Sequence, residues 1–171
     1  MTTENARRLV LLRHARAESD GDDVSRTLTD AGREAARAAG RKLASLDIAP
    51  DLALCSEAAR ARETWKEAAG ELPSRGKTRY EDVLYEASLG DLISLINTVS
   101  DDVSDLAVIG HNPGIAALAE ALAGDGGDDL LHRMNHSGFP SAAIAVITFN
   151  DSWKAVEQGS GELTQFWTPG A

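Results

Sequence analysis

The sequence predicts an α/β domain built on a largely parallel β-sheet. Short aliphatic runs alternate along the chain with segments of helical periodicity, and turn residues separate them. A chain of 171 residues has enough material for one domain with a real core and too little to expect two. We therefore expect residues 1–171 to form a single domain.

The first part of the chain is predicted to contribute two strands and two helices. Thr29 precedes an alanine- and arginine-rich segment with apolar residues at helical spacing, so it is a candidate N-cap. Residues 15–28 before it are polar and rich in aspartate, which predicts a loop. The expected strands cover residues 9–12 and 51–56, and the expected helices cover residues 29–46 and 58–69, with Trp65 facing inward.

The second part of the chain is predicted to add helices, one buried strand and a hairpin. Asn112-Pro113-Gly114 favours a helix start because asparagine caps well and proline fits the first turn. The expected segments are a loop at 71–76, an apolar stretch at 83–85, a helix at 89–99, a strand at 106–110, a flexible acidic loop at 124–129, and strands at 142–149 and 152–157 joined by Asn150-Asp151. The hairpin would give the sheet an antiparallel edge.

The composition excludes several classes of partner. The chain has 27 acidic and 17 basic residues and a formal net charge of −10. Nucleic acid and anionic membranes attract basic surfaces, so neither is expected as the main partner. Cys55 is the one cysteine, which excludes an internal disulfide, and no apolar run approaches the length of a membrane span or a signal-peptide core. We expect a cytoplasmic protein.

Cationic and imidazole side chains follow the predicted strands. The carboxyl ends of parallel strands share one edge of a sheet, so these groups are expected to converge on one pocket. Imidazoles, guanidiniums and a helix amino end suit a tetrahedral phosphoryl group without any requirement for a metal. The residues are Arg13 and His14 after the first strand, Ser56 and Arg60 after the second, His111 after the third, and Arg26 in the polar loop.

Arg60 also has a purely structural interpretation. It could form a surface salt bridge with Glu57, Glu63 or Asp51 instead of binding a ligand. Arg62 lies two residues further on and faces elsewhere on the helix, so we expect it to be an ordinary surface residue.

The ordered set of motifs resembles the histidine phosphatase superfamily, which includes the phosphoglycerate mutases, and the resemblance covers residues 8–168. Several segments look like the small SixA-type phosphohistidine phosphatases within it. Ala15 and Thr27 stand where this family more usually has glycine and proline. The motifs are Arg13-His14-Ala15, Leu54-Cys55-Ser56 followed by Arg60-Ala61 and Thr64, Arg26-Thr27-Leu28-Thr29 with Gly32, Leu84-Tyr85-Glu86-Ala87, Ile109-Gly110-His111-Asn112-Pro113 and Phe139-Pro140-Ser141-Ala142.

The resemblance implies a phosphoglycerate mutase-like, three-layer α/β/α sandwich and a covalent mechanism without a cofactor. Neutral His14 would attack phosphorus and form a phosphohistidine, which water then hydrolyses. Arg13, Arg60 and Arg26 would hold the phosphoryl oxygens, and His111 would donate to the same group.

The family resemblance leaves the substrate open between two classes. The short segments between motifs leave little material for a lid, so the leading expectation is phosphohistidine on another protein. The alternative is a small phosphorylated metabolite, whose ester would need a general acid. Glu86 is the candidate acid, although Glu81 and Asp82 are also near, and Glu86 could instead be an exposed acid at a helix start. A non-catalytic phosphate-binding protein is a third possibility.

Two further features have structural interpretations. His132 and His136 are four residues apart, but the surrounding glycines predict a loop and no metal motif accompanies them, so we expect no metal site. Cys55 lies in an apolar strand and is expected to be a core residue.

Overall fold

A computed structural model describes residues 6–124 and 128–170 of the chain. Within these residues the sheet has the strand order β3-β2-β4-β1-β5-β6. The first four strands in this order are parallel, and β5 runs antiparallel to both β1 and β6, which confirms the predicted mixed sheet. The strands are β1 (Arg7–Arg13), β2 (Leu52–Ser56), β3 (Lys77–Glu81), β4 (Asp105–Gly110), β5 (Ile144–Phe149) and β6 (Glu162–Trp167).

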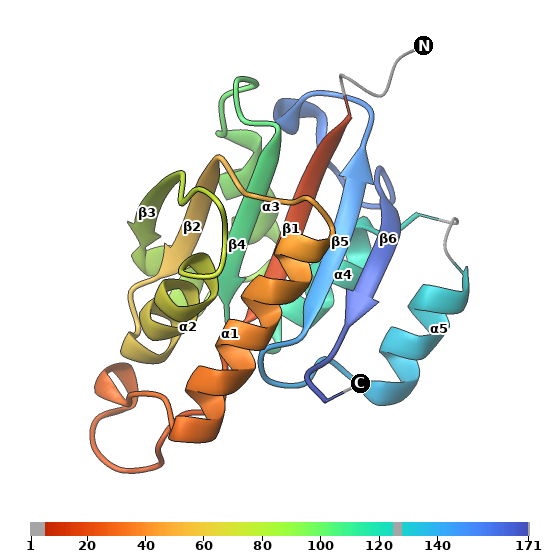
Figure 1. The fold of residues 1–171 in the computed structure, drawn as a ribbon. Coiled ribbons are helices and arrows are strands. Elements are labelled where there is room, and N and C mark those ends of the chain that lie inside the picture. The colour runs from red at the N-terminus through yellow and green to blue at the C-terminus, as the bar shows by residue number, and fades with distance from the viewer. Residues whose placement is uncertain (1–5, 125–127, 171) are drawn as a thin grey trace.

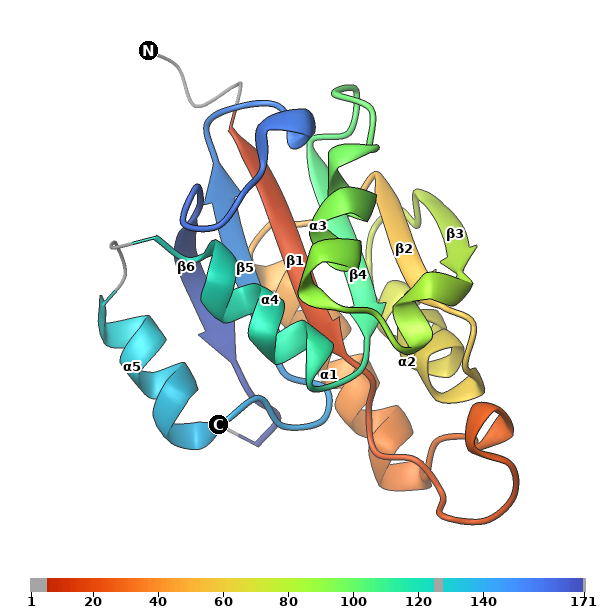
Figure 2. The ribbon, with the colours of Figure 1, turned by 180° about the vertical axis from the view of Figure 1, so that it is seen from behind.

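Helices cover both faces of the sheet and make three layers. Helices α1 (Asp30–Ser45) and α2 (Ala59–Ala69) lie in front of the sheet in Figure 1. Helices α3 (Leu89–Asn97) and α4 (Gly114–Leu122) cover the opposite face in Figure 2, and α5 (Asp128–Ser137) lies beside β6. None of the helices in the described part of the chain is long and apolar enough to cross a membrane.

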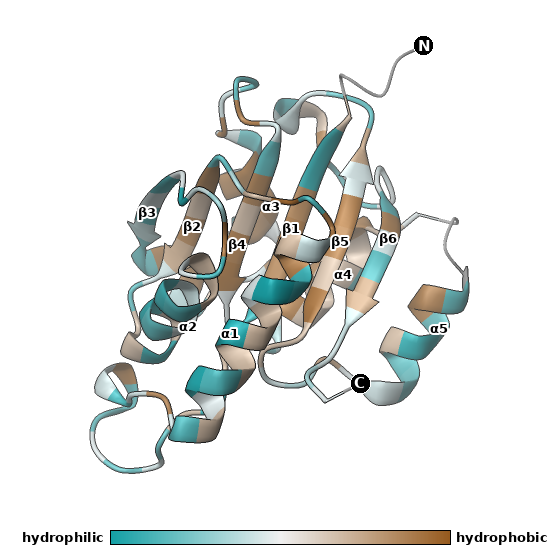
Figure 3. Ribbon diagram, in the orientation of Figure 1, coloured by the Kyte–Doolittle hydropathy of each residue, from teal (hydrophilic) through white to brown (hydrophobic). Residues whose placement is uncertain are grey.

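Strand β1 shows how the sequence builds a core on each face. Leu9 and Leu11 belong to the apolar cluster that includes α3 and α4, whereas Val10 and Leu12 belong to the cluster with α1 and α2. Successive strand side chains point to opposite faces, so a strand covered on both sides needs an unbroken aliphatic run. Figure 3 shows this pattern as brown ribbon along the central strands.

Helix α1 crosses α2 closely. It begins as predicted, because the Thr29 side chain accepts a hydrogen bond from the backbone N–H of Gly32. At Gly40 a Cβ atom would collide with the backbone carbonyl oxygen of Ala68 in α2. The backbones of α1 and α2 can therefore approach this closely only because residue 40 is a glycine, which has no side chain. Trp65 of α2 is buried against the sheet as predicted.

The second hairpin strand lies later in the chain than predicted. Instead of a strand over 152–157, Trp153–Ala155 form a 3-10 turn, and β6 starts at Glu162. Trp153 is buried, and the side-chain amide of Asn97 donates to the backbone oxygens of Trp153 and Val156 at 2.9 and 3.0 Å. These bonds occupy carbonyls that a sheet would use, so the strand prediction for 152–157 was wrong.

Three further predictions need correction. Strand β3 was missed because its sequence, KTRYE, is mostly polar and exposed, and the apolar stretch that follows is a 3-10 turn over Asp82–Tyr85. The segment with His132 and His136 is helix α5, held by buried Met134, and not a loop. Of the loop predicted at 124–129, residues 125–127 lie outside the described residues, and 128–129 belong to α5.

Helix α4 starts at Gly114, directly after Pro113.

Candidate active site

Three strand ends meet at the lower edge of the sheet in Figure 1. Arg13 of β1 is paired with Gly110 of β4, so His14 and His111 leave adjacent parallel strands at the same level. Their ring centroids are 5.2 Å apart. Strand β2 flanks β4 on the other side and ends at Ser56, whose Oγ lies 2.7 Å from Nε2 of His111.

The ring of His14 is oriented by its own backbone. Nδ1 lies 2.8 Å from the backbone oxygen of Ala15. A carbonyl oxygen can only accept, so Nδ1 carries the hydrogen and Nε2 keeps its lone pair. The pKa of His14 is lowered to about 4, chiefly by burial and also by the positive charges of Arg60, Arg13 and Arg26, against the opposite effect of the Ala15 hydrogen bond. His14 is therefore a neutral imidazole with a free Nε2 at pH 7.

His111 is oriented by Ser56 in a similar way. The Ser56 Oγ accepts the backbone N–H of Ala58 at 3.2 Å, and its hydroxyl hydrogen is free to donate to Nε2 of His111. This arrangement places the ring hydrogen of His111 on Nδ1, which is buried and has no partner among the described residues. Burial is the main cause that lowers the pKa of His111 to about 4, with His14 and Arg60 adding to it. His111 is thus a neutral donor at pH 7.

Arg60 is buried in the first turn of α2 and is paired with an aspartate that sequence reasoning did not identify. Its Nη1 donates to the backbone oxygen of Asp23 at 2.6 Å, and its Nη2 donates to Oδ2 of Asp23 at 3.2 Å. Neither Glu57, Glu63 nor Asp51 is its ion-pair partner. The Nε atom of Arg60 is buried and has no hydrogen-bond partner in the described part of the chain.

Arg13 is held from the opposite side of the site. Its Nη1 donates to the backbone oxygen of Phe139 at 3.0 Å, and the Asn112 side chain donates to the same oxygen at 2.9 Å. As in Arg60, its Nε is buried without a partner among the described residues. The Phe139 carbonyl therefore fixes Arg13 at Nη1, but it leaves the Nε–H of the guanidinium without a partner among the described residues.

Arg26 lies at the margin of the site. It donates to the backbone oxygen of Glu18 at 3.1 Å and to Oδ1 of Asp23 at 2.9 Å, which are both on its own loop. Its charge nevertheless acts on His14. The structure thus places Arg26 near His14 without a hydrogen bond that aims it inward.

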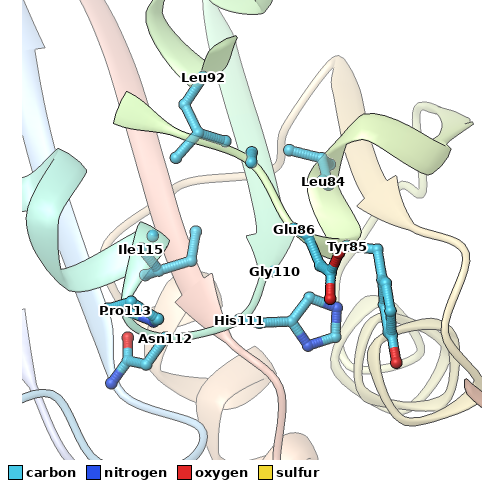
Figure 4. A pocket seen from close by; sticks show the side chains of 11 residues that line it. Leu84, Tyr85, Glu86, Leu92, Gly110, His111, Asn112, Pro113 and Ile115 are labelled. Carbon is cyan, nitrogen blue, oxygen red and sulfur yellow. The ribbon is translucent and has the colours of Figure 1, made fainter. Parts of the chain in front are cut away.

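Glu86 lines the cavity at this end of the sheet. Its side chain is exposed and extends toward the ring of His111 in Figure 4. Glu81, a second acid considered for the same role, is instead paired with Arg79. The cavity has a volume of about 460 Å³ and is lined by Asp23, Arg60, Tyr85, Glu86, Ala87, His111, Asn112 and Pro113.

Two residues that tie the site together were missed as functional candidates. Tyr85 donates its hydroxyl to the Asp23 carboxylate, and its ring lies edge-on to His111 with centroids 5.5 Å apart. Thr64 is buried one helical turn after Arg60, and its Oγ1 accepts the backbone N–H of Ala15 at 2.8 Å. The spacing of Thr64 from Arg60 was a usable signal, whereas nothing in the sequence links Tyr85 to residue 23.

Other chemistry-bearing residues lie outside this site. Cys55 is buried in β2, and burial raises the pKa of its thiol to about 12, so it is a core residue as predicted. His132 and His136 stack on α5 with centroids 6.3 Å apart. Over residues 6–124 and 128–170, no group of three or more His, Cys, Asp or Glu side chains is placed to hold a metal ion.

Comparison with known proteins identifies the family of the chain. Residues 9–134 match the histidine phosphatase superfamily (branch 1). The chain is 40% identical over 163 residues to an uncharacterized protein of Mycobacterium tuberculosis. The matched region covers 92% of this chain and 99% of that relative.

Two solved structures are similar over nearly their whole length. A candidate SixA phosphohistidine phosphatase from Nakamurella multipartitia has 32% identity and a TM-score of 0.83, covering 97% of this chain and 98% of that one. A candidate SixA from Agrobacterium tumefaciens has 32% identity and a TM-score of 0.79, covering 95% and 99%. The chain belongs to branch 1 of the histidine phosphatase superfamily.

Proposed function

We propose that the protein is a phosphatase that removes the phosphoryl group from phosphohistidine on another protein, through a covalent phosphohistidine at His14. One observation carries this proposal. Arg13 Nε, Arg60 Nε and His111 Nδ1 are buried donors without partners among the described residues, and they come from three different strand ends around His14. Buried donors are normally satisfied, and the oxygens of a phosphoryl group would satisfy all three.

In the first step, the lone pair on Nε2 of His14 attacks phosphorus opposite the leaving nitrogen. A new P–N bond forms, the P–N bond to the substrate ring breaks, and its electron pair returns to that ring. A substrate ring protonated on its other nitrogen leaves as neutral imidazole, so no enzyme acid is needed. His14 becomes positively charged, and its Nδ1–H bond to Ala15 O at 2.8 Å stabilises the charged ring.

In the second step, water attacks phosphorus from the side that the substrate ring has left. The P–N bond to His14 breaks, the ring returns to its neutral form, and the proton lost by water leaves with the phosphate or the solvent. The guanidiniums and His111 stabilise the equatorial oxygens in both steps, because their donors are already in place when charge shifts.

The choice of a protein substrate is supported by the lack of a long insertion near the site. Between α2 and α3, the described chain contains little more than β3 and the turn Asp82–Tyr85. An uncovered site can admit a phosphohistidine displayed on a protein surface. The two similar SixA structures are described as candidate phosphohistidine phosphatases, which points to the same substrate class.

A small phosphorylated metabolite is the second candidate substrate, and one observation favours it. Glu86 lines the same cavity as His111 and Arg60. In that position its carboxyl group could protonate the alkoxide that leaves a phosphate ester. Substitution of Glu86 separates the two substrate classes, because only ester cleavage would need this acid.

The test compares substrates and traps the intermediate. Purified protein is assayed on a histidine-phosphorylated carrier protein, on phosphoramidate and on a panel of sugar phosphates, with His14→Ala and Glu86→Gln as variants. We expect a radiolabelled, acid-labile phosphoenzyme in the wild type and none in His14→Ala, with phosphohistidine turnover retained in Glu86→Gln. Efficient sugar phosphate turnover that Glu86→Gln abolishes would favour the metabolite phosphatase. Activity unchanged by His14→Ala would refute the covalent mechanism.

A further inference from the structure

Asp23 holds together three side chains at the margin of the site. Its Oδ2 accepts from Arg60 Nη2 and from the hydroxyl of Tyr85, and its Oδ1 accepts from Arg26 Nη2. Its backbone oxygen accepts from Arg60 Nη1 at 2.6 Å. One exposed aspartate thus receives hydrogen bonds from two arginines and one tyrosine, and it joins the loop after β1 to α2 and to the segment before α3.

The loop that carries Asp23 is closed at its base, which explains how its tip returns to α2. Ala17 forms a bridge with Leu28, and Glu18 N donates to Thr27 O at 2.7 Å. The backbone N–H of Leu28 also donates to Glu63 of α2 at 2.7 Å. Figures 1 and 2 show the loop as an orange arc beyond the amino end of α2, with the short turn Asp23–Ser25 on the side of the arc next to α2.

The bonds to Asp23 leave part of the Arg60 guanidinium free for a ligand. A guanidinium has five N–H groups, and two of those in Arg60 are taken by Asp23. The unused groups include Nε, which is buried without a partner among the described residues. Asp23 therefore fixes the plane of the guanidinium from the loop side while another edge remains available to phosphate oxygens.

Arg26 also uses two of its N–H groups, but its surroundings differ from those of Arg60: its side chain is 25% exposed against 7% for Arg60, and its Nε is not among the buried atoms without a partner in the described part of the chain. Both of its hydrogen bonds go to its own loop, one to Glu18 O at 3.1 Å and one to Asp23 at 2.9 Å. These bonds hold the turn and the Asp23 carboxylate in shape.

We propose that Asp23 is a positioning residue that orients Arg60 for phosphoryl transfer, and that Arg26 acts through Asp23 and not as a direct phosphate ligand. This inference rests on the proposed phosphatase function. It goes beyond the family resemblance, which implies that Arg26 binds the phosphoryl oxygens. Misplacing Arg60 affects the transition state more than substrate capture, so loss of Asp23 should lower kcat more than it raises KM.

The test uses Asp23→Asn, which keeps the shape of the side chain but removes its charge. With phosphoramidate as substrate, kcat/KM should fall about 10- to 100-fold, mostly in kcat, and inhibition by vanadate should weaken. The matched control is Asp22→Asn, which removes the same charge from the neighbouring residue in the same turn. The Asp22 side chain forms no capping hydrogen bond in the described structure, so this variant should behave as wild type.

A double-mutant cycle tests the role of Arg26. If Arg26 acts through Asp23, Arg26→Gln combined with Asp23→Asn should be no worse than Asp23→Asn alone. Independent, multiplicative losses would show that Arg26 touches the phosphoryl group and would overturn that part of the inference. Tyr85→Phe removes a third hydrogen bond to Asp23 without changing charge, and it should lower kcat a few-fold in the same direction.

The opposite role for Asp23 gives an opposite result. If its carboxylate merely occupies the place of a phosphate, Asp23→Asn should bind vanadate more tightly and turn over phosphoramidate at least as fast. Thermal melting of each variant separates a local effect from unfolding. A wild-type protein that forms no phosphoenzyme would refute the proposed function itself, whereas an active wild type with an unaffected Asp23→Asn would refute this inference alone.

Discussion

Thr64 provides a test of how the fold supports the nucleophile. Its Oγ1 accepts the backbone N–H of Ala15 at 2.8 Å and donates to the backbone oxygen of Arg60 at 2.7 Å. The side chain therefore links helix α2 to the peptide immediately after His14. Thr64→Val has nearly the same shape and removes only the hydroxyl, so it tests this link without creating a cavity.

The magnitude follows from burial. Thr64 and Ala15 are both 0% exposed, so water cannot replace the lost hydroxyl without rearrangement. An N–H group left buried without a partner destabilises a protein by about 1–3 kcal/mol. For a chain of this size, the melting temperature should fall by about 2–4 °C for each kcal/mol. The Ala15 carbonyl also orients His14, so kcat should fall with stability.

The measurement is urea unfolding at pH 7 together with kcat on phosphoramidate. Thr98→Val is the matched control, because the Thr98 hydroxyl bonds to Leu95 O at an exposed helix end, and its loss should change the free energy of unfolding by less than about 0.5 kcal/mol. Thr64→Ser keeps the hydroxyl and should retain kcat. A Thr64→Val protein as stable and as active as wild type would refute the reasoning.

Three other changes have directional outcomes. The pKa of His14 falls from 6.5 unfolded to about 4 folded, so the stability tied to neutral His14 is complete above pH 6.5 and is lost as pH falls toward 4. Between pH 7 and pH 4.5 this loss is about 2–3 kcal/mol, and urea titrations of His14→Gln should show a correspondingly flatter pH dependence. Gly40→Ala should destabilise the protein by more than about 2 kcal/mol in thermal melts, since the new Cβ meets the backbone oxygen of Ala68, and a neutral result would contradict the close helix crossing. Ser56→Ala frees Nε2 of His111 to take the ring hydrogen, so kcat should drop about 10-fold or more, and ring-nitrogen NMR should show a mixture of tautomers where wild type shows the Nδ1 form.

The parts of the site that the sequence predicts are those placed by regular structure. His14 and His111 follow aliphatic runs that have to be buried strands, and adjacent parallel strands bring their ends together. Arg60 follows from the same rule, because a helix that starts after β2 begins at the same edge. Periodicity was therefore sufficient to predict that these three residues converge, although their roles in catalysis stay a prediction.

The parts that the sequence does not predict are placed by tertiary contacts. Strand β3 is polar and exposed, and its place in the sheet comes from pairing with β2. Trp153 interrupts the expected hairpin because its ring is buried against Phe149 and its indole N–H donates to the backbone oxygen of Val103. Local pattern cannot reveal either fact, since both depend on what lies on a neighbouring element.

Asp23 illustrates the same limit within the site. It lies among several aspartates in a long polar loop, and loop sequences carry little information about where the tip returns. The bond from Leu28 N to Glu63 and the bridge between Ala17 and Leu28 fix the base of the loop. Arg26 lies three residues after Asp23, but its presence indicates that this acid is held in place only once these contacts are known.

The charges around His14 explain how an acidic protein can be suited to an anionic substrate. Arg13, Arg26 and Arg60 act on His14, whereas two carboxylates line the cavity: Asp23, which is paired with Arg26 and Arg60, and Glu86. Burial is the main cause that keeps His14 and His111 neutral at pH 7. The site therefore has an excess of positive charge within a chain of net charge −10. At physiological ionic strength, salt screens electrostatic fields between exposed charges beyond about 8 Å. The acidic residues on the rest of the surface therefore weaken the attraction of a distant anion, but they do not cancel its attraction to the arginines once it is in the site. Protonating either histidine would add charge where cations already gather, and a phosphoryl dianion removes that excess. The surrounding cations thus add to the effect of burial that keeps His14 neutral, and they would favour the phosphoryl group proposed as its substrate.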